Sequence, residues 1–279
     1  MISIARDTIR ASSLPGYPDC PRRWAARQLR TEIETAGYRL RTTGTSIAAA
    51  IGTGVHGGAA YLLKEKMLGR KPFDAEDEAV DVFREAIHDG EILMDEKTAP
   101  TKNDAEKQVT RMLAAFERGV LPAVNPIMVE ERLQAIRGNI TLSGQGDNLC
   151  EEPNALRDLK TGARAGMHRP QLGAYSLLYR SHGRQVHRAI VDFIQRVSLR
   201  QAQPEVVSTT YDAGRCETAA LRVLDHIERD MKLFREGDGK AFLPGDPWAF
   251  AANPSSMLCS ERWCPAFGSD FCKEHQGAK

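Results

Sequence analysis

Apolar residues recur every three or four positions along three stretches in the first half of the chain. Ile47, Ile51 and Val55 open the clearest of these stripes, with the spacing of one face of a helix. Polar residues flank each stripe, as expected for helices that bury one side against a core. The helices predicted from this pattern span residues 46–67, 74–89 and 102–119.

After residue 125 the pattern changes to short runs that resemble strands. Such runs, bounded by turn-forming residues, predict a β-sheet. Turns are expected at Arg137-Gly138-Asn139 and at Glu152-Pro153-Asn154, so that the first three strands form an antiparallel meander. The predicted strands span residues 127–134, 139–149, 154–160, 186–196 and 205–211, and two further helices span residues 168–182 and 214–236.

The two ends of the chain lack this regularity. A turn-rich segment leads to Cys20 and into a helix that Pro21 is suited to begin, because a first helical position does not need its missing N–H. Residues 31–45 are polar and predict a loop, and the tail from Phe242 is irregular. The predicted organisation is one α/β domain over residues 1–279, with a helical portion over residues 46–125 and a sheet core over residues 127–212.

Composition narrows the functional classes. Charged residues make up 27% of the 279 residues, but the net charge is only +1, so any contact with nucleic acid depends on local basic patches. One such patch, interpreted on its own as a solvated helix face, consists of Arg22, Arg23, Arg27 and Arg30. No run reaches the ~20 apolar residues of a membrane span, and the first residues lack the apolar stretch of a signal peptide. We therefore expect a cytoplasmic protein, in which six cysteines favour metal or cluster binding over disulfides.

The segment from Gly144 to Tyr175 carries the clearest chemistry. Asp147 and Asp158 lie in short β-like runs, and Lys160 follows two residues after Asp158, so on a strand Asp158 and Lys160 point to one face. Two carboxylates from neighbouring strands can hold a hard divalent cation such as Mg²⁺. A lysine beside them can stabilise a phosphate transition state or position a water. The arrangement favours hydrolysis of a phosphodiester bond.

The order of these motifs resembles the PD-(D/E)XK nuclease superfamily, and within it the RecB-like exonuclease branch. The motifs are Asp147, then Asp158-x-Lys160, then Gln171-x-x-x-Tyr175. The resemblance implies a restriction-endonuclease-like αβββαβ core, in which helices flank a central mixed sheet with an antiparallel meander. It also implies that Asp147, Asp158 and the backbone carbonyl of Leu159 bind the metal, and that Lys160 lies beside the scissile phosphate.

The same resemblance implies further site residues. Gln171 and Tyr175 are four positions apart and share a helix face, where they would orient the lysine or bind the DNA backbone; on spacing alone Tyr175 is equally a core aromatic. His56, among glycines that allow close approach, would bind a divalent ion or a water; otherwise it is a helix histidine packed against the sheet. On the first strand, Glu130 and Glu131 point to opposite faces, and Glu130 is the preferred metal ligand.

Four of the cysteines form a second pattern. Cys259, Cys264 and Cys272 lie in the tail, and Cys20 lies near the N-terminus. This distribution, with proline after Cys20 and after Cys264, resembles the iron–sulfur nucleases, among them the AddB nuclease domain and the cluster-bearing nuclease of CRISPR adaptation. The resemblance implies a [4Fe–4S] cluster that joins the chain ends in a subdomain formed by residues 8–30 and 242–279. Zinc suits a four-cysteine set equally well on spacing alone.

The expected function is that of a DNA exonuclease that uses Mg²⁺ or Mn²⁺. It would act at DNA ends or on single strands, in recombination, repair, or phage or CRISPR DNA processing, with a possible protein partner. The chain has no Gly-x-x-x-x-Gly-Lys-Ser/Thr loop, so ATP is not expected as a fuel. Two alternatives stay open: a CRISPR-type nuclease that trims DNA fragments before integration, and a zinc-stapled, non-catalytic DNA-binding protein.

Overall fold

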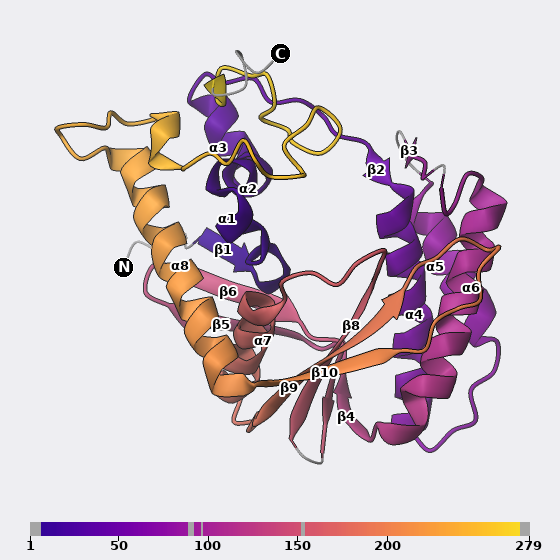
Figure 1. Ribbon diagram of the computed structural model, residues 1–279. Coiled ribbons are helices and arrows are strands. Elements are labelled where there is room, and N and C mark those ends of the chain that lie inside the picture. Colours follow the sequence, from indigo (N-terminus) through magenta and orange to yellow (C-terminus); the bar gives the residue numbers. More distant parts are fainter. Residues whose placement is uncertain (1–6, 89–91, 96, 152–153, 274–279) are drawn as a thin grey trace.

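A computed structural model describes residues 7–88, 92–95, 97–151 and 154–273. Helices lie on both sides of a mixed β-structure (Figure 1). One side is formed by α4 (Ile47–Met67), α5 (Ala75–Ala86) and α6 (Lys102–Gly119). The other side is formed by α7 (Arg169–Ser181), α8 (Ala213–Glu236) and both ends of the chain. The predicted α/β class and the principal helices are therefore confirmed. None of the described helices is both long and apolar enough to cross a membrane.

The larger sheet has five strands in the order β10-β9-β8-β7-β4. Its central strand β8 runs parallel to β9, because α7 crosses over between them. The pairs β4–β7 and β7–β8 are antiparallel, as the predicted meander requires, and β9–β10 is antiparallel as well. The strands are β4 (Pro126–Val129), β7 (Asn148–Cys150), β8 (Ala155–Gly162), β9 (Arg188–Gln195) and β10 (Val207–Asp212).

A smaller sheet has the order β1-β6-β5. Its hairpin of β5 and β6 turns at Gly138, as predicted, whereas Glu152 and Pro153 of the other predicted turn lie outside the described residues. The strand β1, which the sequence analysis missed, runs parallel to β6. The strands are β1 (Asp7–Arg10), β5 (Arg132–Arg137) and β6 (Ile140–Gln145), and β2 (Thr45–Ser46) and β3 (Ile92–Leu93) form a separate short pair.

Two of the predicted strands are each broken in two. The single strand predicted over residues 127–134 is wrong, because Glu130 adopts a left-handed backbone conformation with φ of 49° and separates β4 from β5. The strand predicted over residues 139–149 is also divided, because the chain bends at Asp147 between β6 and β7. The two breaks are adjacent, since the N–H of Glu130 donates to the carbonyl oxygen of Asp147 at 3.1 Å.

Glycines let α4 pack closely against α5 and α6. A side chain at Gly54 would come within 2.7 Å of the carbonyl oxygen of Ala79, and one at Gly58 would come within 2.8 Å of Leu113. Of the other glycines around His56, Gly57 faces Val82 of α5, whereas Gly52 faces Thr161 of the sheet. The same side of α4 contributes to a buried apolar core with α6 and the larger sheet, which fixes the helix over the sheet.

The N-terminal segment contains α1 (Gly16–Asp19), α2 (Pro21–Gln28) and α3 (Arg30–Thr35). Pro21 is the first residue of α2, as predicted, and the Cys20 sulfur accepts a hydrogen bond from the N–H of Arg23 at 3.4 Å. The loop predicted over residues 31–45 is wrong in its first part, because Ile33 is fully buried and holds α3 against the core. Because most residues around Ile33 are polar, the sequence pattern did not predict this helix.

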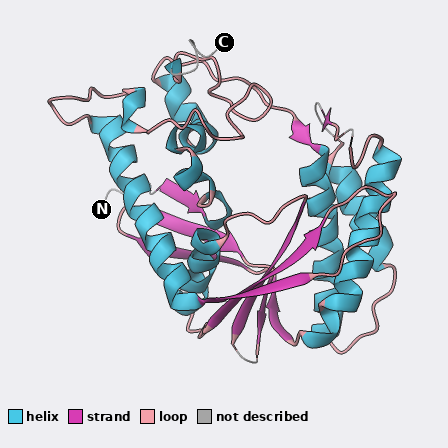
Figure 2. Cartoon of the chain, viewed as in Figure 1, coloured by secondary structure: helices cyan, strands magenta, loops and turns pink. Residues whose placement is uncertain are grey.

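The irregular tail is packed against this N-terminal segment (Figures 1 and 2). Phe250 and Phe271 are fully buried, and both lie against Phe234 of α8. Arg22 is 1% exposed and donates to the carbonyl oxygen of Phe250 at 2.9 Å, and Arg23 is 5% exposed. The interpretation of the arginine patch as a solvated helix face is therefore wrong for these two arginines. It failed because residues far along the chain, Phe250 for Arg22 and Ser256 for Arg23, complete their surroundings.

Candidate active site

The central strand β8 carries the predicted acid and lysine. Asp158 is 1% exposed, and its Oδ2 lies 2.7 Å from the Nζ of Lys160. Between them Leu159 faces the opposite side and packs into the core under α4 and α6. The alternation of β8 thus places Asp158 and Lys160 on one face, as the spacing of two residues predicts.

Asp147 joins this pair from the bend between β6 and β7. Its Oδ1 lies 3.3 Å from the Nδ1 of His56 on α4, and its Oδ2 accepts a hydrogen bond from the N–H of Leu159. The structure therefore brings His56, Asp147, Asp158 and Lys160 together, from one helix and two parts of the sheet. The expected role of the Leu159 carbonyl as a metal ligand stays a prediction.

The two aspartates differ in their electrostatic environment. Burial raises the pKa of Asp158 to about 6, since the attraction of Lys160 only partly opposes it and the charge of Asp147 adds to it. Burial acts in the same direction on Asp147, but His56 and Lys160 outweigh it and lower the pKa of that carboxyl. Burial likewise opposes the charge of His56, yet the Asp147 carboxylate raises the pKa of the imidazole. Asp147 is therefore held as the anion that His56 and Lys160 stabilise.

The carboxyl oxygens of Asp158 provide a test of whether a cation fits here. Both are buried; within the described residues Oδ1 has no hydrogen-bond partner, and Oδ2 contacts only the Lys160 ammonium at 2.7 Å. Buried polar atoms are rarely left so, because the loss of solvation is costly. Carboxylate oxygens are the ligands that Mg²⁺ and Mn²⁺ prefer, and Mg²⁺ is commonly bound through one or two carboxylates together with substrate phosphate and water. The donor set formed by Asp147 and Asp158 thus fits a divalent cation.

Glu130 lies at the edge of the same site. It lines a hollow of about 990 Å³ with His56 and Lys160, and its Oε2 lies 3.8 Å from the Nζ of Lys64. Burial and the nearby Asp147 raise the pKa of Glu130. Glu131, by contrast, is exposed. The break at Glu130, rather than strand alternation, directs its side chain to this hollow.

Gln171 and Tyr175 support the site from α7. The Gln171 amide donates to the Tyr175 hydroxyl at 2.9 Å, and both side chains are buried. In the described structure no hydrogen bond joins either of them to Lys160. Tyr175 packs in the core against Gly144, where a side chain would come within 2.9 Å of its ring. Tyr175 therefore packs against the strand that leads to Asp147, and Gln171 holds its hydroxyl.

Sequence reasoning missed two residues near the site. Tyr179 continues the spacing of four along α7, and a side chain at Gly146 would come within 2.7 Å of its buried hydroxyl. Lys64 lies eight residues after His56, about two helical turns along α4. Tyr179 and Lys64 could have been predicted from Tyr175 and His56, because residues three or four positions apart on a helix share a face.

Three of the four end cysteines, Cys20, Cys259 and Cys264, are neighbours where the N-terminal segment meets the tail. No disulfide joins them; Cys20, Cys264 and Cys272 are buried, and Cys259 is half-buried. Burial raises the pKa of Cys259 to about 11, and the neighbouring Cys264 and Cys20 add to this. Among the described residues, no three His, Cys, Asp or Glu side chains stand in the arrangement of a metal centre. The thiols are chemically suited to a cluster, but they would have to converge further to bind one.

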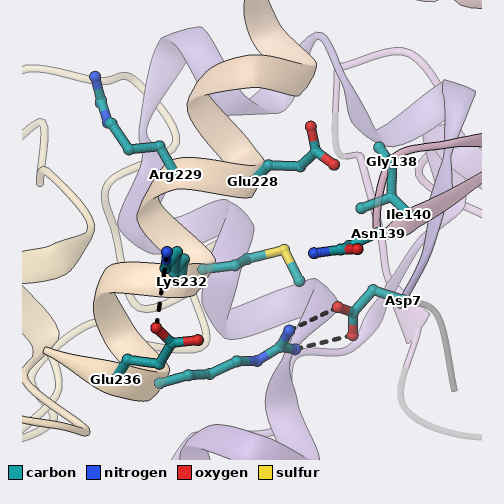
Figure 3. A pocket seen from close by; sticks show the side chains of 10 residues that line it. Asp7, Gly138, Asn139, Ile140, Glu228, Arg229, Lys232 and Glu236 are labelled. Carbon is teal, nitrogen blue, oxygen red and sulfur yellow. Dashed lines mark hydrogen bonds and ion pairs between the residues drawn. The ribbon is translucent and has the colours of Figure 1, made fainter. Parts of the chain in front are cut away.

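A separate hollow of about 450 Å³ lies between α8 and the β5–β6 hairpin (Figure 3). Its charges are largely paired: Arg235 contacts Asp7 at 2.6 Å and Glu32 at 2.7 Å. Asp158 and Lys160 do not line it. The Arg235 contacts attach β1 and α3 to α8, so this hollow belongs to the framework and not to the catalytic site.

The fold and the site define a protein of the restriction-endonuclease-like class, with two aspartates and a lysine at the centre of a mixed sheet. The family model of the PD-(D/E)XK nuclease superfamily matches residues 9–268, and the chain belongs to this superfamily. The predicted superfamily and nuclease activity are thereby confirmed.

Solved structures give a more distant comparison. The chain is similar to a "putative exonuclease" from Eubacterium rectale, with a TM-score of 0.56 and 12% identity over 91% of this chain and 87% of that chain. A phage-related exonuclease from Haemophilus somnus 129PT has a TM-score of 0.26 and 14% identity over 62% of this chain and 95% of that chain. A comparison with curated proteins finds no match. At 12% identity the first of these structures supports the fold alone. The second is too dissimilar to support even the fold.

Proposed function

We propose that this nuclease is a metal-dependent DNA exonuclease that hydrolyses phosphodiester bonds at DNA ends or on single strands. The observation that supports the proposal is the buried Asp158 carboxyl between Lys160 and the anchored Asp147: within the described residues its Oδ1 has no hydrogen-bond partner, and its Oδ2 contacts only the Lys160 ammonium. Such a carboxyl is costly for the protein alone and useful for binding a cation. The similar structure from Eubacterium rectale is that of a "putative exonuclease", an activity that acts at DNA ends.

The residues of the site divide the chemistry between them. Asp147 and Asp158 would hold Mg²⁺ or Mn²⁺, with the Leu159 carbonyl and Glu130 as further oxygen donors. When bound, the cation supplies a polarised phosphate and an acidified water. Lys160 is placed to stabilise the negative charge that grows on the phosphate oxygens. His56 holds Asp147 in orientation through its Nδ1 contact and is placed to hold a water at the same edge.

An assay on end-labelled DNA tests the function. Single-stranded, double-stranded and circular DNA are each incubated with Mg²⁺, with Mn²⁺ and with chelator. We expect short products from linear DNA only, and only with a divalent cation. Cleavage of closed circles would indicate an endonuclease instead, and the absence of any cleavage by the wild-type protein, with Asp158→Asn equally inactive, would refute the catalytic proposal.

We also propose that Cys20, Cys259, Cys264 and Cys272 bind a [4Fe–4S] cluster. Support comes from Cys20, Cys259 and Cys264, which are neighbours in space; with Cys272 of the same tail they match the ligand number of such a cluster. Protein purified without oxygen should be brown and contain ~4 iron atoms per chain. About one zinc per chain and no iron would show that the cysteines bind zinc instead of an iron–sulfur cluster. A chain that contains neither metal would refute the metal-bound junction.

A further inference from the structure

A second, smaller hollow adjoins the catalytic one. It has a volume of about 240 Å³ and is lined by Arg10, Arg23, Arg27 and five uncharged residues. None of the described aspartates and glutamates lines it. Ser12 lines both this hollow and the hollow of about 990 Å³ that contains Lys160. A ligand that occupies the catalytic hollow can therefore extend past Ser12 into a surrounding of positive charge.

The three arginines differ in how far their charge is already balanced. Arg23 pairs with Asp19 at 2.6 Å. Arg27 donates to the neutral carbonyl of Trp263 at 2.7 Å, and burial together with the charge of Arg23 lowers the pKa of its guanidinium. Arg10 is exposed, and within the described residues its guanidinium has no hydrogen bond or ion pair. Arg10 and Arg27 thus present positive charge that the described part of the protein does not neutralise.

The local fold holds the backbone at Arg10 in place. Arg10 ends β1, opposite Ser143 of β6, the strand that leads to Asp147. The Ser13 hydroxyl donates to the Arg10 carbonyl at 2.7 Å and accepts from the Trp24 indole at 3.2 Å, which ties β1 to α2. Regular structure therefore connects the backbone at Arg10 to β6, the strand that leads to Asp147.

We propose that Arg10 and Arg27 form a binding subsite for a phosphate group of the nucleic acid, next to the catalytic centre on the side of Ser12. This subsite rests on the proposed nuclease function and specifies how the strand is held. Guanidinium groups bind phosphate through paired, charge-assisted hydrogen bonds, and the hydroxyl of Ser12 and the amide of Gln28 add uncharged donors. The group bound is either an internal phosphodiester or a terminal phosphate.

A binding measurement that needs no cleavage tests the subsite. Affinity of the metal-free protein for a labelled single-stranded oligonucleotide is measured across a range of salt concentrations. In Arg10→Gln we expect binding roughly 10-fold weaker at low salt, and a salt slope lower by about 0.7, because the substitution removes one ionic interaction with a phosphate. The matched control Arg222→Gln removes the same charge from an exposed position on α8 that lines neither hollow, and should change neither quantity appreciably.

Modified substrates then identify the phosphate. Single neutral methylphosphonates are placed along the strand, and separate substrates carry or lack a terminal phosphate. One modification should weaken binding by the wild-type protein but have little further effect on binding by Arg10→Gln. Its position in the oligonucleotide shows whether the bound phosphate is internal or terminal. The subsite is overturned if Arg10→Gln behaves like Arg222→Gln, or if the losses are equal at all positions. These outcomes are separate from the proposed function, since binding through Arg10 without cleavage would refute only the function.

Discussion

Replacing Asp158 by asparagine should stabilise the metal-free protein while it abolishes cleavage. The asparagine would keep the size of the side chain but remove a carboxylate that burial disfavours. The pKa of Asp158 is raised from 3.8 to about 6, which corresponds to about 3 kcal/mol in favour of the neutral form near pH ~7. For a chain of this size, that stabilisation should raise the Tm of Asp158→Asn by about 6–12 °C relative to wild type.

The sign follows from proton linkage. An acid whose pKa is higher in the folded state binds protons more readily when folded, so its contribution to stability is present below about pH 4 and is lost as the pH rises through about 6. The difference in Tm between Asp158→Asn and wild type should therefore be small near pH ~4 and large near pH ~7. Comparing the two proteins at each pH removes the contributions of the other titrating groups.

Thermal unfolding with chelator present measures this difference, and Asp192→Asn is the control. Asp192 is equally buried, but it accepts two hydrogen bonds from Arg157, at 2.9 and 2.6 Å. The same substitution there takes the charged partner from the part-buried guanidinium of Arg157 and should destabilise by about 3 kcal/mol. If the Tm of Asp158→Asn near pH ~7 is equal to or below that of wild type, the ionised Asp158 carboxylate does not destabilise the metal-free fold, and the reasoning is refuted. Added Mg²⁺ should raise the Tm of wild type and not that of the variant, since ligands stabilise the state that binds them.

Three further predictions concern other parts of the chain. Lys160→Ala should bind DNA but lose turnover, because its charge acts chiefly in the transition state; binding titrations alongside single-turnover rates check this, and weaker binding with normal turnover would contradict it. Cys20→Ala should lose all bound metal yet still unfold cooperatively, since buried contacts of Arg22 and Phe250 hold the chain ends without it; metal analysis and calorimetry check this, and full metal content would contradict the ligand assignment. Gly173→Ala should destabilise by more than ~3 kcal/mol, because its Cβ would lie 1.9 Å from the Cys216 carbonyl, whereas Gly214→Ala meets no described atom closer than 3.4 Å and should be tolerated; denaturant unfolding compares the two.

The sequence predicted those features that depend on local periodicity. The apolar stripe of α4 and the alternation around Asp158 and Lys160 are local patterns, and the structure reproduces both. The conformation of Glu130 could not be predicted in this way, since a non-glycine residue with positive φ has no local signature there. It is held by its hydrogen bond to Asp147, which lies beyond the β5–β6 hairpin.

Features that depend on distant partners were also missed. The strand β1 is only four residues long and pairs with β6, far along the chain. The buried Arg22 and Arg23 look like surface residues until Phe250 and Ser256 cover them. The extension of the site to Arg10 depends on the same distant pairing, because β1 brings that residue beside the strand leading to Asp147.

The packing of the tail on the N-terminal segment has a consequence for synthesis on the ribosome. Tyr17, Trp24 and Ile33 emerge first, but they share their core with Phe250 and Phe271, which are made last. Until then these early apolar side chains have only part of their cover, and exposed apolar surface on a nascent chain favours aggregation. Chains truncated before Phe250 should therefore need chaperones or precipitate. The helices α4–α6, whose core contains neither end of the chain, are free to pack together much earlier.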